Sequence, residues 1–449
     1  MLIRFTAANH RSIKEPVELS FVAVDGDRSE VRHFERLNEG ILTLAAIYGP
    51  NASGKSNILD AITWVAFAVR NSLRAWDDCI PREPFRFAGS SEEPSIYSVD
   101  FLVDGTRHTY TLQLTERGVE FEELVSYPEK RVRTLFTREG GGVNFRRGLQ
   151  GVSGLKELLT PTTLVLTLAR RFEVPDLIGA AQFLGNITTP FVRRRRVNYI
   201  GPTRYSSWGM SSTSKLFIDA YRPSMSGEQA ELFPSADADD LELARHLLRF
   251  ADLGIEDVEI VEVNEPATTM GRPRFDLRLV HRAGNEKESF ELSEESDGTQ
   301  MWFRLIGPAL AALTRGYPLV LDEIDASLHP LLSSQLLELF RTPQINKRNA
   351  QLIFSSHDTT LLGDLNRDEV WFTEKGEDGA TRLTALAEFG SDKVRRSLNL
   401  ERAYLQGRFG ALPNLRDSYL LKILEGTRDR RESEWERSLE PRKLRDDAT

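Results

Sequence analysis

The pattern of apolar and polar residues predicts a strand, a glycine turn and a helix near the start of the chain. Alternating segments and one unbroken apolar run lie at 2–5, 17–22 and 41–48. The apolar run is typical of a strand buried on both faces, and it ends at Gly49. From Asn57 to about Leu73 the apolar residues recur at helical spacing. We therefore expect a buried strand that enters a turn and then a helix.

The segment 85–147 has a different pattern, which predicts a β-meander. Its alternating runs lie at 95–103, 109–114 and 134–137. Asp104-Gly105, between the first two runs, is a hairpin signal. From 151 to 254 the pattern is less regular and predicts a mainly helical insertion, with its clearest helix at 239–250.

Strands and helices alternate in the second half of the chain. The predicted strands are 258–263, 275–280, 318–321 and 351–354, and the predicted helices are 299–313 and 330–341. This alternation is typical of a parallel or mixed sheet covered by helices. The residues from Gly426 onward are mostly charged, and we expect a loose helix or a frayed tail there.

Composition limits the possible classes of protein. The 449 residues are 40% hydrophobic and 28% charged, which favours a folded protein over a disordered one. No apolar stretch approaches the roughly 18–20 residues of a transmembrane helix, and no export signal is evident. We therefore expect a cytoplasmic protein without a membrane partner. The single cysteine, Cys79, has no second cysteine with which to form a disulfide or a structural zinc site.

Residues Gly49 to Ser56 match the phosphate-loop pattern G-x-x-x-x-G-K-[ST]. Glycines let backbone N–H groups wrap a phosphate, Lys55 would reach the β- and γ-phosphates, and Ser56 would bind Mg²⁺. The motif follows an apolar run and opens a helix, which favours a nucleotide site over a plain glycine turn. The expected nucleotide contacts are Gly49, Pro50, Asn51, Ala52, Ser53, Gly54, Lys55, Ser56 and Asn57.

Asp322 and Glu323 follow the predicted strand 318–321. One carboxylate can hold the hydration shell of Mg²⁺, and the next can orient or deprotonate an attacking water. Acids at a strand end also serve as helix N-caps, and the dipeptide alone does not decide between these roles. His357 follows the strand 351–354, so we expect it at the same edge of the sheet, where it would contact a γ-phosphate.

Ser296, Asp297 and Gly298 open the predicted helix 299–313. A Ser-x-Gly segment at a helix N-terminus offers a hydroxyl, exposed N–H groups and the helix dipole to an anion. Taken alone, the segment is better explained as a helix cap.

The order of these motifs resembles that of the ABC ATPase heads. In this comparison the motifs are Walker A at 49–56, a degenerate signature at 296–300, Walker B at 319–323, a D-loop at 324–328 and a switch histidine at His357. The opening Asn9-His10-Arg11-Ser12 resembles the start of the SMC, RecF and OLD-like branch. The segments 295–299, 322–330 and 404–413 are similar to ATPases of prokaryotic antiphage and abortive-infection systems of the Rlo/AbiL and PARIS type.

The resemblance implies an α/β fold: an ABC-type P-loop NTPase head with a mixed β-sheet and helices, a β-rich extension and a helical insertion. The implied parts are an N-terminal half of the head at 1–84, the extension at 85–150, the insertion at 151–254, a C-terminal half of the head at 255–395 and a helical segment with a charged tail at 396–449.

The resemblance also implies a homodimer, or a higher oligomer, in which two heads sandwich two ATP molecules with Mg²⁺. Ser296 and Gly298 of one chain would close on the phosphate held by the other chain. Glu323 would be the hydrolytic base and His357 a catalytic contact. The implied Mg²⁺ ligands are Ser56 and Asp322, and Asp325 would be a link across the interface.

Two features depart from the family pattern. Asp297 stands where a signature glycine is usual, so closure of the dimer would be slow or would need a trigger. The Q-loop glutamine cannot be placed among Gln113, Gln150 and Gln182, because all three lie in weakly matched sequence.

The net charge of −9 argues against a body that coats nucleic acid uniformly. The densest positive run is 193–196, near which other arginines could lie, namely Arg131, Arg133, Arg146 and Arg147. These would bind DNA or an acidic protein, or would form a solvated face.

We expect an ATP-driven switch in antiphage defence. It would respond to DNA or a phage protein and would control an effector such as a nuclease or toxin from a neighbouring gene. The alternative is a DNA-repair or chromosome-associated ATPase that acts on DNA directly. A built-in nuclease is disfavoured because little chain follows Pro413, and a transporter ATPase is disfavoured by the long insertion.

Overall fold

A computed structural model covers the chain. It describes residues 1–190, 212–221, 238–263, 274–389, 400–406 and 408, apart from residues 77, 88, 130, 253 and 327. The chain divides into two units, Met1–Ala411 and Leu412–Thr449. The described residues all belong to the first unit.

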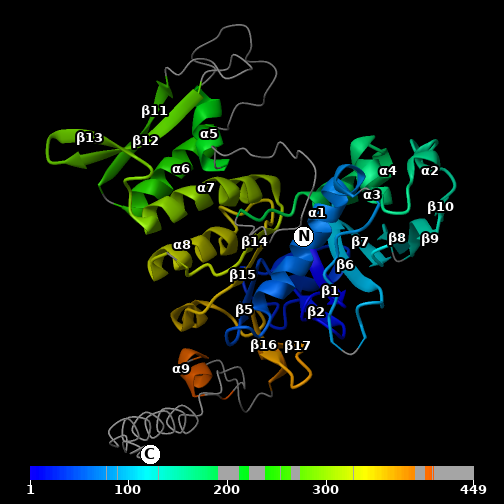
Figure 1. The fold of residues 1–449 in the computed structure, drawn as a ribbon. Coiled ribbons are helices and arrows are strands. Elements are labelled where there is room, and N and C mark those ends of the chain that lie inside the picture. Colours follow the sequence, from blue (N-terminus) through cyan, green and yellow to red (C-terminus); the bar gives the residue numbers. More distant parts are fainter. Residues whose placement is uncertain are drawn as a thin grey trace, which may run out of the picture. The chain divides into compact units, whose positions relative to one another are not determined.

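An antiparallel sheet of seven strands has the order β10-β9-β8-β7-β6-β1-β2 (Figure 1). Its strands are β1 (Leu2–Ala8), β2 (Val17–Ser20), β6 (Ser95–Val103), β7 (Thr106–Leu114), β8 (Val119–Tyr127), β9 (Arg133–Glu139) and β10 (Gly142–Phe145). The meander expected at 85–147 contributes β6 to β10. Asp104 and Gly105 form the turn between β6 and β7 with φ of 49° and 70°, the left-handed values that a tight hairpin turn requires.

A second sheet of five strands contains the buried strands expected from the apolar runs. In the order β14-β15-β5-β16-β17, its strands are β14 (Leu319–Leu321), β15 (Leu352–Ser355), β5 (Leu44–Tyr48), β16 (Val370–Lys375) and β17 (Thr381–Ala385). The first four are parallel and β17 is antiparallel. Every residue of β5, β14 and β15 is buried, which explains their continuous apolar sequence.

The single strand expected at 41–48 is wrong, because the chain changes partners within it. The run divides into the end of β4 (Leu37–Ile41), which pairs with β3 (Arg32–Phe34), and β5 (Leu44–Tyr48). Between them, the N–H of Leu42 donates to the carbonyl of Phe21, which directly follows β2, whereas the carbonyl of Thr43 accepts from the N–H of Leu352 in β15. Both halves are buried, so the apolar pattern does not reveal the break.

Helix α1 (Lys55–Ala75) begins at the end of the glycine turn and packs against two later helices (Figure 1). These are α3 (Val165–Arg171) and α4 (Pro175–Gly185), preceded by the short α2 (Leu155–Leu158). The hydroxyls of Ser72 in α1 and Thr167 in α3 lie 2.6 Å apart. Apolar residues of α1, α3 and α4 share one buried cluster with the seven-stranded sheet.

A three-stranded antiparallel sheet lies beside another group of helices (Figure 1). The strands are β11 (Ile255–Val263), β12 (Arg274–Ala283) and β13 (Glu286–Glu291), and the helices are α5 (Ser212–Tyr221), α6 (Ala238–Ala251) and α7 (Asp297–Arg315). The hydroxyl of Thr213 in α5 accepts from the N–H of Gly307 in α7 at 2.8 Å and donates to the carbonyl of Phe303, also in α7. Thr213 therefore inserts into the helical ladder one residue before Pro308, a common cause of a local bend.

The remaining elements are α8 (Pro330–Arg341), the 3-10 helices η3 (Thr359–Asp364) and η4 (Leu386–Glu388), and α9 (Leu400–Leu405). The bounds of α8 are those expected from the sequence. Within the described ranges, no helix has both the length and the apolar character needed to cross a bilayer.

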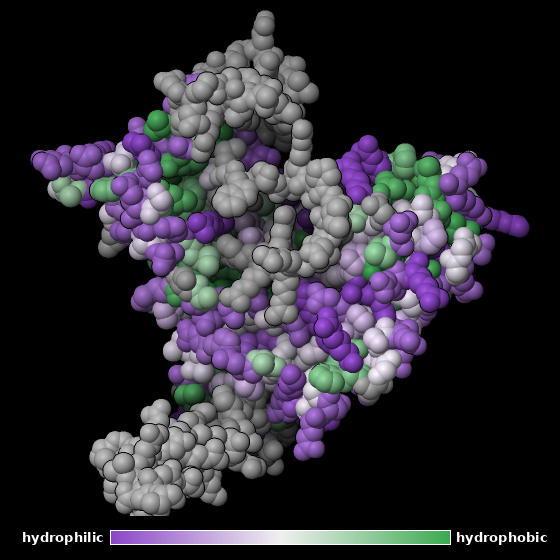
Figure 2. Space-filling model, in the orientation of Figure 1, coloured by the Kyte–Doolittle hydropathy of each residue, from purple (hydrophilic) through white to green (hydrophobic). Residues whose placement is uncertain are grey.

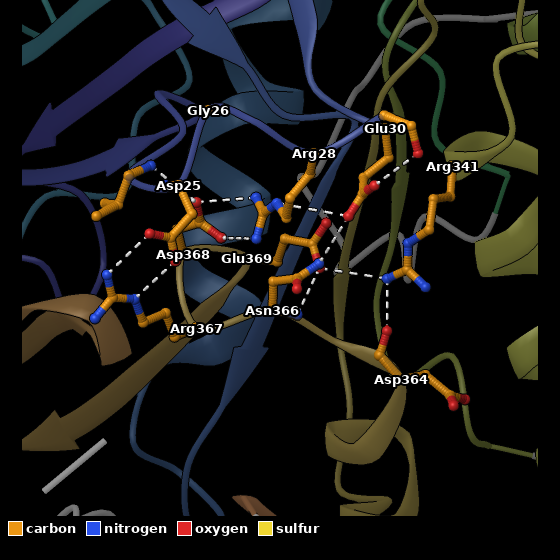
Figure 3. Close-up of polar contacts among 12 residues, drawn as sticks. Asp25, Gly26, Arg28, Glu30, Arg341, Asp364, Asn366, Arg367, Asp368 and Glu369 are labelled. Carbon is orange, nitrogen blue, oxygen red and sulfur yellow. Dashed lines mark hydrogen bonds and ion pairs between the residues drawn. The ribbon is translucent and has the colours of Figure 1, made fainter. Parts of the chain in front are cut away.

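A buried network of charges fixes the loop before β3 to the segment before β16 (Figure 3). The carboxylate of Asp368 accepts 2.9 and 3.0 Å hydrogen bonds from the guanidinium of Arg28 and a 2.8 Å bond from the N–H of Val24. Next to it, burial raises the pKa of Glu369, although the guanidinium of Arg341 opposes this shift. The network therefore joins residues more than 300 positions apart in the sequence.

Candidate nucleotide-binding site

Three of the predicted motifs meet at one edge of the five-stranded sheet. β14, β15 and β5 run parallel, with Leu319 opposite Leu352 and Leu352 opposite Leu44. Their carboxyl ends therefore lie side by side, and the ends of parallel strands are a common location for ligands. The glycine turn follows β5, the acid pair follows β14 and His357 follows β15.

Two glycines are required by the shape of the loop. Gly49 and Gly54 have φ of 148° and 111°, which favour glycine, and Ala52 between them has a left-handed φ of 63°. A Cβ on Gly49 would collide with Thr373 and one on Gly54 with Thr381. The loop therefore lies against β16 and β17 as closely as its backbone permits.

Hydroxyl groups from these two strands hold the loop in place. Thr373 in β16 lies 2.5 Å from the hydroxyl of Ser53 and donates to the carbonyl of Tyr48 at 3.2 Å. Thr381 in β17 donates to the carbonyl of Ser53 at 2.8 Å. Sequence reasoning missed both threonines, because nothing in their local pattern differs from that of ordinary strand residues.

The opening segment of the chain also reaches the loop. The hydroxyl of Ser12 lies 2.7 Å from that of Thr381 and accepts a 2.5 Å bond from the side-chain amide of Asn57. The neighbouring residues His10 and Arg11 lie 2.9 Å from the two carboxylate oxygens of Asp60 in α1. The segment 9–12 therefore supports the start of α1. Its resemblance to a family motif was the only signal of this role in the sequence.

Lys55 is almost fully buried beneath the loop, with 5% of its surface exposed. Its ammonium donates to the carbonyls of Gly49 at 2.8 Å and Pro50 at 3.3 Å. Burial lowers the pKa of Lys55, and the nearby carboxylates of Asp322 and Glu323 oppose this shift. The loop tip, which includes Asn51 and Ala52, is exposed.

Ser56 and Asp322 meet across the site although 266 positions separate them. The hydroxyl of Ser56 donates to Oδ1 of Asp322 at 3.0 Å, and Ser355 donates to the same oxygen at 2.6 Å. A hydroxyl and a carboxylate are hard oxygen donors of the kind that Mg²⁺ prefers, so these residues fit the metal expected from the sequence.

Glu323 has an uncommon backbone conformation, with φ of 54°. Its N–H donates to the hydroxyl of Ser355 at 2.8 Å. Glu323 also lines a cavity of about 150 Å³ between the acid strand and α7, together with Asp322, Met301 and other residues. Strained residues of this kind often occur at functional sites.

Asp325 contacts the histidine segment of its own chain. Its two carboxylate oxygens accept from the N–H of His357 at 3.1 and 3.3 Å. The His357 side chain is exposed. Ser327, in the same predicted D-loop, lies outside the described residues.

The predicted signature segment begins α7. Ser296 is its N-cap and accepts from the N–H of Thr299 at 3.2 Å, and Gly298 lies in the first turn. Among the described residues, no hydrogen bond connects Ser296 or Gly298 to the glycine loop of the same chain.

Several other predicted residues lie away from this edge of the sheet. Arg131, Arg133, Arg146 and Arg147 are exposed on or beside β9 and β10, whereas the arginine run 193–196 lies outside the described residues. The glutamine candidates Gln113 and Gln182 lie in β7 and α4, and Gln150 follows β10.

The glycine loop between a buried strand and a helix, facing an Asp-Glu pair that directly follows a parallel strand, defines a P-loop ATPase head. Comparison with protein-family models agrees: residues 44–363 match the family described as "AAA domain, putative AbiEii toxin, Type IV TA system". The match spans well over half of the chain, which therefore belongs to this family. The expected α/β fold, an ABC-type P-loop head with mixed sheet and helices, a β-rich extension and inserted helices, is confirmed.

The chain is also locally similar to a chromosome-partition protein. The chromosome partition protein Smc of Xanthomonas oryzae pv. oryzae (strain KACC10331 / KXO85) is 28% identical over 105 residues, which are 23% of this chain and 8% of that protein. An SmcHead structure bound to the C-winged helix domain of ScpA has a TM-score of 0.47 at 15% identity, covering 88% of this chain and 99% of that one. The SMC head domain from Thermotoga maritima gives 0.39 at 15% identity, covering 86% and 98%.

Proposed function

We propose that the chain binds ATP with Mg²⁺ at the carboxyl ends of β5, β14 and β15 and hydrolyses it. The observation that carries this proposal is the 3.0 Å contact between Ser56 and Asp322, beside Lys55. Apart from Pro50, which has no N–H group, residues 49–57 would bind the phosphates through backbone N–H groups, and Lys55 would add its positive charge. Ser56 and Asp322 would hold Mg²⁺, which neutralises negative charge on the phosphates when bound.

In this proposal Glu323 is the general base. Its carboxylate would orient the attacking water and accept its proton, while His357 would contact the γ-phosphate. Ser355 supports both acids, since its hydroxyl bonds to Asp322 and to the N–H of Glu323. The site thus has separate groups for metal binding and for proton transfer.

The first test is calorimetric titration of ATP with Mg²⁺ into a Lys55→Ala variant. We expect binding to fall below detection, because the variant loses the buried ammonium beneath the loop. Lys156→Ala, at an exposed position in α2, is the matched control and should bind like the unmodified protein. Unchanged affinity in Lys55→Ala would refute the proposed site.

The proposed active form is a dimer in which Ser296 and Gly298 of one chain complete the site of the other, with Asp325 at the interface. Supporting this, Ser296 and Gly298 lie at a helix N-terminus, where exposed N–H groups favour anions. Higher oligomers would build on the same dimer.

A mixing experiment tests this arrangement. Lys55→Ala and Ser296→Arg chains should each be inactive alone, whereas a mixture should regain ATPase activity, because each mixed dimer has one intact composite site. A mixture that stays inactive after subunit exchange would argue against sites shared between two chains.

We further propose a cytoplasmic switch in antiphage defence, of the Rlo/AbiL or PARIS type, that controls an effector such as a nuclease or toxin. The family description, which names a toxin of a toxin–antitoxin system, supports this role. The head would comprise residues 1–84 and 255–395. DNA or a phage protein would be the trigger.

The alternative function is an SMC-like or repair ATPase that acts on DNA directly, and the local similarity to Smc favours it. Phage plating with and without the neighbouring gene separates the two proposals. Protection that needs the neighbour supports the switch, whereas ATPase stimulation by DNA ends, without protection, supports the alternative.

A further inference from the structure

A cluster of one histidine and two carboxylates lies outside the nucleotide site. Asp252 follows α6, His281 lies in β12, and Glu295 directly precedes the N-cap of α7. One possible ligand atom from each residue lies within 4.8 Å of the other two. Three separate segments of the chain therefore bring metal-binding groups to one point beside the three-stranded sheet.

The imidazole of His281 is held in a defined orientation. Its Nε2 lies 2.8 Å from Oε1 of Glu295, and the ring packs edge-on against Phe290 with centroids 5.3 Å apart. Gly254 lies on the other side. A Cβ there would be 3.1 Å from both Nδ1 of His281 and Oδ1 of Asp252, so the glycine leaves space between these two atoms.

Within the described residues, His281 is the only basic residue that forms an ion pair with the carboxylates of this cluster. The Glu295 side chain is 8% exposed and that of His281 is 22% exposed. In the described ranges, no lysine or arginine forms an ion pair with Asp252 or Glu295, and the nearby Arg282 and Lys287 instead pair with Glu256. A cation beside a carboxylate that is largely withdrawn from water offsets its lost hydration.

We propose that Asp252, His281 and Glu295 bind a divalent first-row transition-metal ion of the Zn²⁺ class. An imidazole nitrogen favours such ions over Mg²⁺ and Ca²⁺, and two carboxylates match the charge of the ion. Ligand atoms about 2.0–2.2 Å from a shared ion are roughly 3–3.5 Å apart, so side-chain movements of about 1 Å would complete the site, with water as a further ligand.

The position of this site gives the ion a structural role. Glu295 adjoins Ser296, the N-cap of α7, while Asp252 and His281 belong to the group of α6 and the three-stranded sheet. The ion would therefore fix this group to the start of α7. In Figure 2 the β12–β13 hairpin beside the site has a mainly hydrophilic surface.

Titration of Zn²⁺ into the nucleotide-free full chain tests the proposal, with hydrogen exchange as a second readout. We expect one Zn²⁺ site that weakens about 100-fold or more in His281→Gln, which keeps an amide donor for Glu295, and in Glu295→Gln. Zn²⁺ should slow exchange in peptides that cover 249–256, 278–284 and 292–300. The control is His246→Ala, which alters an exposed histidine paired with Glu242 on α6.

The outcomes are distinct. Loss of this Zn²⁺ site in both glutamine variants, with binding unchanged in His246→Ala, supports the proposal. Equal Zn²⁺ affinity in all four proteins overturns it, as does protection from exchange that appears only outside the three peptides. Circular dichroism spectra of the variants show whether a loss of Zn²⁺ binding results from misfolding. Glutamine variants that keep both the spectrum and the Zn²⁺ affinity of the unmodified protein also overturn the proposal.

Discussion

Ser355 donates a 2.6 Å hydrogen bond to Oδ1 of Asp322, the oxygen that also accepts from Ser56. The same hydroxyl accepts from the N–H of Glu323 at 2.8 Å. One buried side chain at the end of β15 therefore positions both acids at the end of β14. Because the positions of the proposed metal ligand and the proposed general base depend on one hydroxyl, both proposed functions should be lost together when that hydroxyl is removed.

Ser355→Ala should lower the ATPase rate about 10- to 100-fold, as expected for the loss of a group that orients a metal ligand. Steady-state rates at several Mg²⁺ concentrations measure the effect, which should be partly relieved by more Mg²⁺. Ser333→Ala is the matched control, because Ser333 is fully buried and its hydroxyl has no hydrogen-bond partner in the described part of the chain. Equal ATPase rates in Ser355→Ala and Ser333→Ala would contradict the proposal that Ser355 positions the two acids.

Glu323→Gln should lower the rate of hydrolysis by about 100-fold or more while ATP still binds, because the amide cannot accept the proton of the attacking water. Single-turnover hydrolysis and calorimetric ATP titration separate the two effects. Glu294→Gln, at an exposed position, should hydrolyse ATP at the normal rate. Hydrolysis at the normal rate in Glu323→Gln would mean that another group is the base.

The backbone of Glu323 allows a separate prediction about stability. A left-handed φ costs most residues about 1 kcal/mol, and asparagine tolerates it better. With φ of 54° at this position, Glu323→Asn should unfold at a higher denaturant concentration than Glu323→Gln. The reverse order would show that the residue is not strained.

Gly54→Ala should weaken ATP binding at least tenfold and destabilise the fold by about 2 kcal/mol or more, since φ of 111° and the contact with Thr381 both oppose a Cβ. Denaturant unfolding and ATP titration provide the measurements. Gly140 also has a positive φ, 54°, but a Cβ there would meet nothing within 4 Å. Gly140→Ala should therefore cost only about 1 kcal/mol and leave ATP binding intact. Similar losses of stability and of ATP affinity in Gly54→Ala and Gly140→Ala would indicate that backbone strain alone, without the contact to Thr381, explains the effect of Gly54→Ala.

The sequence was sufficient to place the parts of the site that follow directly from an apolar strand. The glycine loop, Asp322 and His357 each come after such a strand, and parallel strands bring their carboxyl ends together. Ser12 and Thr381 could not be assigned in this way, because their contacts depend on which distant strands become neighbours. The division of the run 41–48 into two strands could not be predicted for the same reason, since a change of strand partner does not alter the apolar pattern.

Asp368→Asn should destabilise the fold by about 2–3 kcal/mol, because it breaks the shorter, doubly hydrogen-bonded ion pair of Arg28 and leaves only the 3.5 Å pair with Glu30 (Figure 3). The Asp368 side chain is only 2% exposed. Asp25→Asn, in the more exposed pair of Asp25 with Arg367, should cost about 1 kcal/mol or less. Unfolding in urea compares the variants, and a loss no larger than that of the control would contradict the importance of the buried pair.

Glu122 should make the stability of the fold depend on pH. It is fully buried in β8, and burial raises its pKa, although bonds from the N–H groups of Val165 and Leu166 and the charge of Arg138 oppose this shift. Because the native state favours the protonated form, the stabilisation is complete below the ordinary pKa of 4.5 and is lost as pH rises through the higher native pKa.

A Glu122→Gln variant isolates this effect, since the amide remains uncharged at every pH. Measured relative to the unmodified protein, the free energy of unfolding of the variant should increase as pH rises above the ordinary pKa of 4.5. Glu369, whose pKa burial also raises, contributes equally to both proteins and cancels in the difference. Glu120→Gln, at an exposed position in the same strand, is the matched control for the loss of a carboxylate from β8. A difference for Glu122→Gln that does not change with pH would show that Glu122 is already ionised in the native state throughout this range.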